Sequence, residues 1–229
     1  MANDKNISYF NFPIEIIKDA IDDIHKTCDN IISYSIYNLF LKLEFGDDEV
    51  KIKHVFDYLG INNPNWKSSL ERAKELFSEI NNHRVKTGIK RDLAFEFRDQ
   101  FKSDFDIALF VAYCALRSIL GSKPYHKCGN DFLLARMAGF AKVDELDEGI
   151  PDRIKKYSNR YQLDKIKKEL ERSWGLKYYS QQTRGFYFSF DISFESLVMQ
   201  AELKRKKYLD KKANEERMQI IKSVKQNLK

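Results

Sequence analysis

The residues of this 229-residue sequence best suited to chemistry are cationic and aromatic side chains between positions 158 and 191. At about 100° per residue, one side of a helix over this region is apolar. That stripe consists of Leu163, Ile166, Leu170 and Trp174. The opposite side carries one aromatic residue and three cations, Tyr161, Lys165, Lys168 and Arg172. A helix that packs by its apolar stripe would turn this cationic face outward, where it suits DNA phosphates and base edges.

A short β-hairpin is predicted directly after this helix. Residues 176–180 and 186–191 alternate apolar and polar side chains and are rich in aromatics, as paired strands are. The five residues between them end in Gly185, which suits a tight turn. Lys177 and Arg184 would place positive charge near the tip of the hairpin. Helix and hairpin together could straddle a duplex.

Four more residues complete the candidate DNA-binding set. Gln162, beside Tyr161, could reach base edges, while Lys155, Lys156 and Arg160 make the chain basic where the helix begins. The alternative is that any solvated helix in a lysine-rich protein shows basic residues outside.

The distribution of charge favours the same half of the chain. Residues 151–229 carry 20 Lys and Arg against 10 Asp and Glu, whereas residues 1–150 carry 20 against 24. Such asymmetry is expected where one part of a protein meets a polyanion, although an acidic membrane surface would attract the same charge. There is no apolar run long enough to span a bilayer and no signal peptide, so we expect a cytoplasmic protein.

Motifs for catalysis, metal binding or nucleotide binding are weak or missing. His126 and Cys128 are close together but lack further ligands at a plausible spacing. The pair Tyr178-Tyr179 is better explained by strand alternation than by a relaxase-type site. No Gly-x-x-x-x-Gly-Lys-Ser/Thr or Gly-x-Gly-x-x-Gly sequence occurs, and the three cysteines read as reduced, mostly buried thiols. We expect no enzyme activity, no cofactor and no metal.

The periodicity predicts a mainly α fold with a small β-hairpin. Residues 9–45 read as mainly helical with an isoleucine stripe, and further helices are expected over 47–59, 68–81, 104–120 and 131–138, the last capped by Asn130. Residues 81–91 read as a loop, and 140–157 as an insertion. A long helix capped by Ser193 runs to the C-terminus. The expected organisation is a helical N-terminal region (1–90), a DNA-binding module (91–192) and a basic C-terminal helix (193–229).

Four stretches of residues 108–190 carry a resemblance to a known class of protein. They are Ala115-Leu116-Arg117-Ser118, Phe132-Leu133-Leu134-Ala135-Arg136-Met137, Tyr161-Gln162-Leu163-Asp164-Lys165-Ile166 and Thr183-Arg184-Gly185-Phe186-Tyr187. This segment resembles the winged helix-turn-helix proteins of bacterial mobile elements and phages, which include regulators and plasmid replication initiators. The resemblance implies that the third helix enters the major groove and that the hairpin, the wing, touches the adjacent backbone or minor groove. The insertion at 140–157 departs from that plan.

Two functions remain open on the sequence. The first is a non-enzymatic, double-stranded DNA-binding protein, with a possible homodimer, acting in regulation or replication of a mobile element. The second is a winged-helix adaptor that binds protein and not DNA. An adaptor could cover the cationic helix face with its own acidic segment at 144–148, whereas a DNA-binding protein should expose that face.

Overall fold

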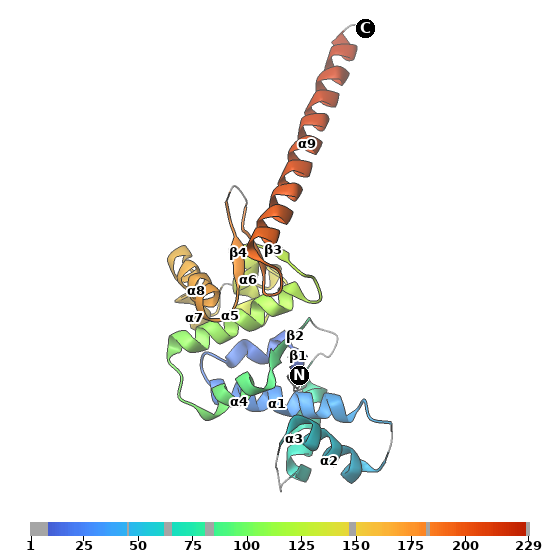
Figure 1. Cartoon of the computed structure of the whole chain (residues 1–229), viewed down its shortest axis with the longest axis vertical. Coiled ribbons are helices and arrows are strands. Elements are labelled where there is room, and N and C mark those ends of the chain that lie inside the picture. The colour runs from blue at the N-terminus through green and yellow to red at the C-terminus, as the bar shows by residue number, and fades with distance from the viewer. Residues whose placement is uncertain are drawn as a thin grey trace, which may run out of the picture.

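The computed structural model describes residues 9–44, 46–61, 66–80, 85–146, 150–181 and 184–227. Within these residues the protein is mainly helical, with two small antiparallel sheets and a long C-terminal helix, which confirms the predicted fold class. Helices and sheets form one body, from which α9 (Phe194–Asn227) projects (Figure 1). Among the described residues no helix is long and apolar enough to cross a membrane.

A two-stranded sheet joins the two ends of the N-terminal region. β1 (Tyr9–Pro13) pairs antiparallel with β2 (Lys86–Lys90), from Tyr9 opposite Lys90 to Pro13 opposite Lys86. The prediction of a mainly helical start and of a loop over 81–91 was therefore wrong where these strands lie; residues 81–84 are outside the described residues. Phe10 and Phe12 are buried while the residues before each of them are exposed, which is the alternation of a strand. The sequence pattern did not predict this strand, because its pairing partner is distant along the chain.

The chain between the two strands is mainly helical. A 3-10 helix, η1 (Ile14–Asp19), leads to α1 (Ile24–Phe40), α2 (Asp48–Leu59) and α3 (Trp66–Glu79). The predicted second and third helices are confirmed: the Asp47 carboxylate accepts a hydrogen bond from the Val50 amide (3.0 Å), and Gly60 ends α2 at φ +63°. β2 runs directly into α4 (Arg91–Asp99), a helix that the sequence pattern did not predict.

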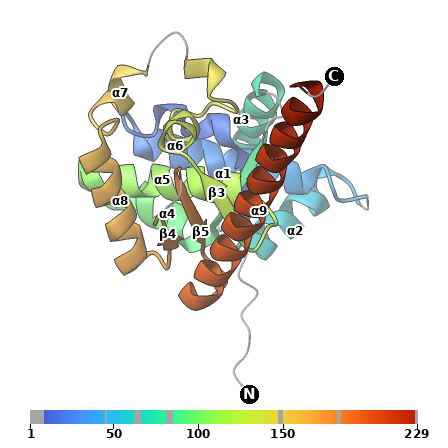
Figure 2. The same ribbon diagram turned by 90° about the horizontal axis from the view of Figure 1, so that it is seen from above.

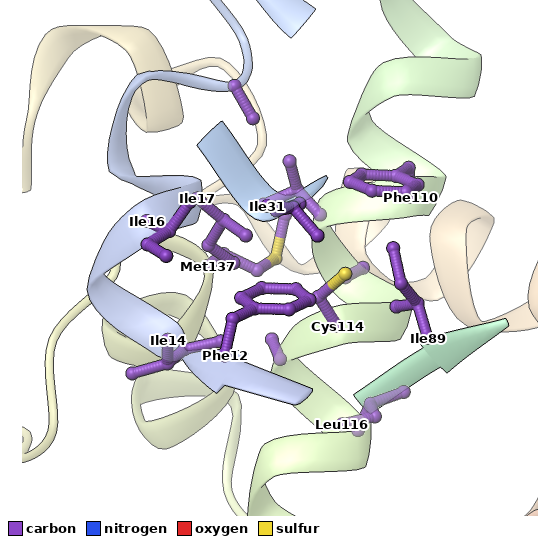
Figure 3. Close-up of a cluster of buried hydrophobic side chains, with 14 of the residues drawn as sticks. Phe12, Ile14, Ile16, Ile17, Ile31, Ile89, Phe110, Cys114, Leu116 and Met137 are labelled. Atoms are coloured by element: carbon purple, nitrogen blue, oxygen red, sulfur yellow. The ribbon is translucent and has the colours of Figure 1, made fainter. Parts of the chain in front are cut away.

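The central helix of the body is α5 (Asp104–Leu120), as predicted. Figure 3 shows Phe12 of β1 packed beside Cys114 and near Ile17, Ile89 and Met137. These side chains belong to one buried cluster that continues from β1 to β5. The Thr87 hydroxyl of β2 also donates a hydrogen bond to the Cys114 carbonyl (2.8 Å). The N-terminal strands are therefore seated directly on α5.

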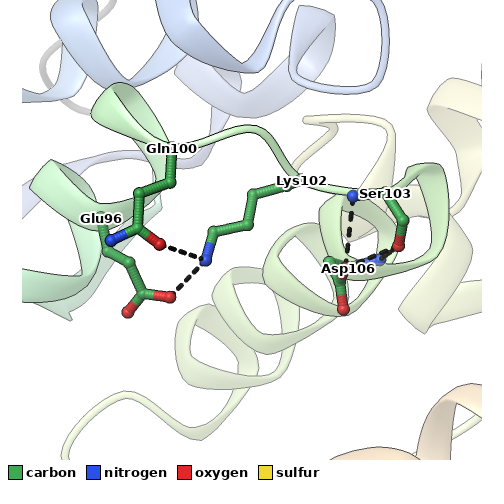
Figure 4. A network of polar contacts seen from close by, with 5 residues as sticks. All are labelled: Glu96, Gln100, Lys102, Ser103 and Asp106. Atoms are coloured by element: carbon green, nitrogen blue, oxygen red, sulfur yellow. Dashed lines mark hydrogen bonds and ion pairs between the residues drawn. The ribbon is translucent and has the colours of Figure 1, made fainter.

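Polar contacts fix the start of α5 against α4 (Figure 4). Ser103 and Asp106 form a capping box, in which each side chain accepts a hydrogen bond from the other residue's backbone amide. Lys102 forms an ion pair with Glu96 and donates a hydrogen bond to the Gln100 side chain (3.2 Å). The Lys102 contacts on the α4 side and the capping box on the α5 side thus fix the turn between the two helices.

The second half of the chain builds a three-stranded sheet between helices. After α5 come β3 (His126–Cys128), α6 (Asn130–Met137), the 3-10 helix η2 (Asp144–Leu146), α7 (Asp152–Lys155) and α8 (Arg160–Ser173). The predicted hairpin is formed by β4 (Lys177–Tyr179) and β5 (Phe186–Ser189), and the strand order is β3-β5-β4. The sequence pattern did not predict β3. Asn130 does not cap α6, because the residue at the cap position is Gly129 and no side-chain cap bond forms.

The first turns of α9 lie across this sheet. Ser193 caps the helix as predicted, with its hydroxyl accepting a hydrogen bond from the Ser196 amide (3.2 Å). Leu197 and Ala201 are buried against Tyr187 of β5. Beyond these turns α9 extends away from the body (Figures 1 and 2), and its exposed residues include Tyr208, Met218 and Ile220.

Candidate nucleic-acid interface

The predicted amphipathic helix with the cationic face is α8. The Asn159 side chain caps this helix by accepting a hydrogen bond from the Gln162 amide (2.9 Å). The predicted apolar stripe is confirmed, since Leu163, Ile166 and Leu170 are fully buried. Trp174 follows the helix and is half-buried, with its ring centroid 5.1 Å from that of Tyr113. Because this stripe holds α8 on the core, the opposite side faces solvent.

The four outward residues share one exposed surface, and the described part of the acidic segment, residues 144–146, leaves them uncovered; Asp147 and Glu148 lie outside the described residues. Tyr161 is 75% exposed, and Lys165, Lys168 and Arg172 are also exposed. The Lys165 ammonium lies 4.5 Å from the ring centroid of Phe105, which restrains the side chain. Lys168 has no carboxylate within ion-pair distance among the described residues.

Acidic neighbours partly neutralise the rest of the helix. Arg172 pairs with Glu169 (2.9 Å), and this ion pair, together with the Ser173 hydroxyl, lowers the pKa of the Glu169 carboxyl. Arg160 is exposed and lies 3.7 Å from Asp164. Gln162 is half-buried beside Tyr161. Lys165 and Lys168 are therefore the two outward cations of α8 that pair with no carboxylate among the described residues.

The basic residues before α8 are tied to carboxylates. Lys156 bonds Asp104 at the start of α5 (2.8 Å), which raises the pKa of the Lys156 ammonium and lowers the pKa of the Asp104 carboxyl. Lys155 lies 3.8 Å from Asp152. Lys156 thus connects the insertion to α5, a structural contact that its position in the sequence did not predict. The insertion itself packs into the body, because Ile154 and Tyr157 are buried.

The two faces of the three-stranded sheet have different neighbours. Tyr178 and Phe186 face α8, since the Lys167 ammonium lies 5.9 Å and 4.9 Å from their ring centroids. Tyr179 and Tyr187 alternate to the other face, where the Tyr179 hydroxyl donates a hydrogen bond to Glu202 of α9 (2.8 Å). Strand alternation therefore accounts for the twin tyrosines, as predicted.

The two predicted hairpin cations are placed differently from each other. Lys177 is two residues from Tyr179 on the same strand, so alternation puts it on the α9 side of the sheet, away from α8. Arg184 is exposed next to Gly185 at the start of β5. Gln182 and Thr183 lie outside the described residues. The structure therefore leaves Arg184 exposed in the connection between β4 and β5, whereas Lys177 is half-buried at the base of the hairpin, opposite Ser189, so the prediction that Lys177 lies near the tip was wrong.

Lys167 is the residue of α8 that sequence reasoning missed. Its side chain is 7% exposed, and its ammonium lies 2.7 Å from the Asp164 carboxylate and over the ring of Phe186. The spacing carried a signal, because Lys167 is four residues after Leu163 and three before Leu170, on the buried side of the helix. It joins α8 to the sheet through its alkyl stem and its charge.

The described residues hold no cluster of three or more metal-ligating side chains. All three cysteines are buried free thiols, and burial raises the pKa of Cys28 and of Cys128 to about 12 and that of Cys114 well above its ordinary value. Thiols held in the neutral form are unsuited to nucleophilic catalysis. What the described residues of α8 present to solvent is positive charge and one aromatic side chain.

Comparisons with protein-family models, with curated protein sequences and with solved structures gave no match.

Proposed function

We propose that the protein binds double-stranded DNA through α8 and the β4–β5 hairpin, without enzymatic activity, as a regulator or replication protein of a mobile element. The observation that carries the proposal is the two-sided character of α8. Its apolar side is buried while Tyr161, Lys165, Lys168 and Arg172 are exposed together. A helix presented in this way has the width and the donors to enter a major groove.

The arrangement of neighbouring elements supports the same function. The resemblance implied a third helix followed by a wing, and α8 follows α5 and α6 and leads directly into β4 and β5. Lys167 and the buried stripe hold α8 on the sheet and α5, so that helix and hairpin would approach a duplex as one rigid unit. In this proposal Arg184 contacts the backbone next to the groove that α8 occupies.

The test is fluorescence-anisotropy binding to duplex DNA at low and near-physiological salt. Wild type is compared with Lys165→Glu/Lys168→Glu and with a matched control, Lys42→Glu/Lys74→Glu, which makes the same charge change at exposed sites of the N-terminal region. We expect salt-sensitive binding that the α8 variant loses and the control keeps, because phosphate contacts release counterions. Equal losses in the two variants would reduce the effect to net charge and refute the assignment to α8.

A protein-interaction role is the second candidate, and one observation favours it. α9 exposes a set of large apolar side chains along its length: Leu203, Tyr208, Leu209, Met218, Ile220 and Ile221. A second copy of the chain is a partner that could cover these side chains. Sedimentation velocity over a range of concentrations therefore tests this role by measuring whether the protein dimerises. A concentration-dependent dimer that Leu209→Asp/Ile220→Asp abolishes, in a wild type that binds no DNA, would favour this role.

A further inference from the structure

Two lysines converge on one tyrosine on the side of the sheet that faces away from α8. The Lys127 ammonium of β3 lies 5.6 Å, and the Lys204 ammonium of α9 5.9 Å, from the ring centroid of Tyr187. Lys204 is also 4.6 Å from the ring centroid of Tyr125. Neither lysine has a carboxylate within ion-pair distance among the described residues. Two cations are thus gathered at one tyrosine without a described carboxylate, an arrangement that suits a bound anion.

The nearest acid on α9 is already engaged. Glu202 accepts a hydrogen bond from the Tyr179 hydroxyl (2.8 Å) and pairs with Arg205 (2.7 Å), and both contacts lower the pKa of its carboxyl. Neither Lys127 nor Lys204 is therefore neutralised by Glu202.

The same side of α9 continues as a row of lysines. Lys207, Lys211 and Lys222 follow Lys204 at intervals that return to one face of a helix, and all are exposed. At 1.5 Å per residue the row from Lys204 to Lys222 is about 27 Å long. Glu215 lies on this same face between Lys211 and Lys222 and pairs with Lys211 (3.7 Å).

The other acids of this stretch point elsewhere. At 100° per residue Glu202, Asp210 and Glu216 lie on other sides of α9 than the lysine row. Glu215 is therefore the one acid on the lysine face among the described residues of α9 beyond Lys204, and the others lie on different sides of the helix.

We propose that Lys127, Lys204, Lys207, Lys211 and Lys222 form a second surface that binds the phosphate backbone of a nucleic acid. This inference rests on the DNA-binding function proposed above and adds to it a contact on the opposite face of the sheet. A row of this length fits a polyanion, whose duplex form carries about one charge per 1.7 Å, better than a single small anion. The tyrosines restrain the two lysines at the root of the row, which reduces the entropy lost when they bind.

Because this second surface lies on the side of the sheet opposite α8, the nucleic-acid backbone that it binds has one of two sources. The duplex held by α8 can bend around the hairpin toward α9, or a second duplex can bind there. In both cases the contacts are made to phosphates and carry no sequence information.

The test compares two variants with the same change in charge. Lys127→Gln/Lys204→Gln/Lys207→Gln removes the root of the row, whereas Lys206→Gln/Lys212→Gln/Arg217→Gln removes three exposed cations from other sides of α9. The dependence of log Kd on log salt concentration is measured for duplex DNA, and circular dichroism checks the helix content. At about 0.9 per phosphate contact, we expect the first variant to lower the slope by up to about 2.7 and the control to change it by less than about 1.

Equal effects of the two variants would overturn the second surface, and so would an unchanged slope in the first. The Lys165→Glu/Lys168→Glu variant separates this result from the proposed function. If it weakens binding while the Lys127 variant has no effect, only the second surface is refuted; if wild type binds no duplex, both proposals fail. Titration with a short duplex of about 15 base pairs, roughly one and a half helical turns, then distinguishes the sources, since two duplexes per chain indicate a second duplex and one indicates a shared one.

Discussion

Replacement of Gly185 by alanine should destabilise the protein far more than the same change at Gly175. Both glycines have a positive φ, +80° and +73°. A Cβ at Gly185 would lie 2.2 Å from the Cys128 carbonyl oxygen, whereas a Cβ at Gly175 would meet no atom within 4 Å. The two variants therefore share the backbone strain and differ only in the steric clash.

The size of the difference follows from the geometry. An alanine at positive φ costs about 1 kcal/mol in either variant. To bring the Cβ–oxygen contact toward the usual 3.5 Å, β5 must move from β3 by about 1 Å. That shift loosens the pairing of Cys128 with Phe186 and loses one or two backbone hydrogen bonds at about 1 kcal/mol each, so the total for Gly185→Ala is about 2 to 3 kcal/mol.

Urea unfolding followed by circular dichroism measures both values. We expect the midpoint of Gly185→Ala to fall well below that of Gly175→Ala, with similar slopes for the two transitions. If the free energies of unfolding agree within about 0.5 kcal/mol, which is near the accuracy of the extrapolation, the close approach of the hairpin to β3 is refuted. The β4–β5 hairpin would then not be anchored to β3 as described.

Three further results are expected from single changes or reagents. Lys167→Ala should lower the free energy of unfolding by about 2 kcal/mol, chiefly because it leaves a void over the sheet and also because it removes the ion pair with Asp164. Lys167→Met should recover most of the loss by restoring the packing, and equal losses in the two variants would contradict this account. The three buried cysteines should not react with a disulfide reagent at pH 8 until urea unfolds the chain, because burial raises the pKa of each thiol; rapid labelling of folded protein would contradict their burial. Lys156→Met should return the pKa of Asp104 toward its ordinary value, as a pH titration followed by NMR would show. Because the pKa of Asp104 is lowered in the folded wild type, the ion pair stabilises the wild type at pH values above the ordinary carboxyl pKa, and this contribution is lost as the pH falls through the lowered pKa. The variant should show no such pH-dependent contribution, and an unchanged pKa of Asp104 in the variant would contradict the pairing.

Local patterns were sufficient to predict the helices that carry the candidate site. The stripe of Leu163, Ile166 and Leu170, the Ser193 cap and the Gly60 stop all depend on residues within a few positions of one another. The outward cations of α8 followed from the same periodicity. Lys167 was missed although it lies on the buried side, because a lysine is rarely expected in a core.

The strands were harder to predict because their partners are distant. β1 pairs with β2 more than seventy positions along the chain, and β3 pairs with β5 across α6 and α8. A three-residue strand such as β3 is too short for period-two alternation to stand out. Strand pairing is nonlocal, so neither its register nor its existence can be read from a window of sequence.

The sequence by itself determined that the chain is mainly helical, that its basic half carries an amphipathic helix followed by a hairpin, and that α8 presents a cationic face. These properties follow from periodicity and charge, which act between near neighbours. Only the tertiary structure decided that Lys156 is tied to Asp104, that Lys177 lies on the far side of the sheet, and that Lys127 and Lys204 meet at Tyr187. Each of these results depends on which surfaces of distant segments are brought together when the apolar core is buried.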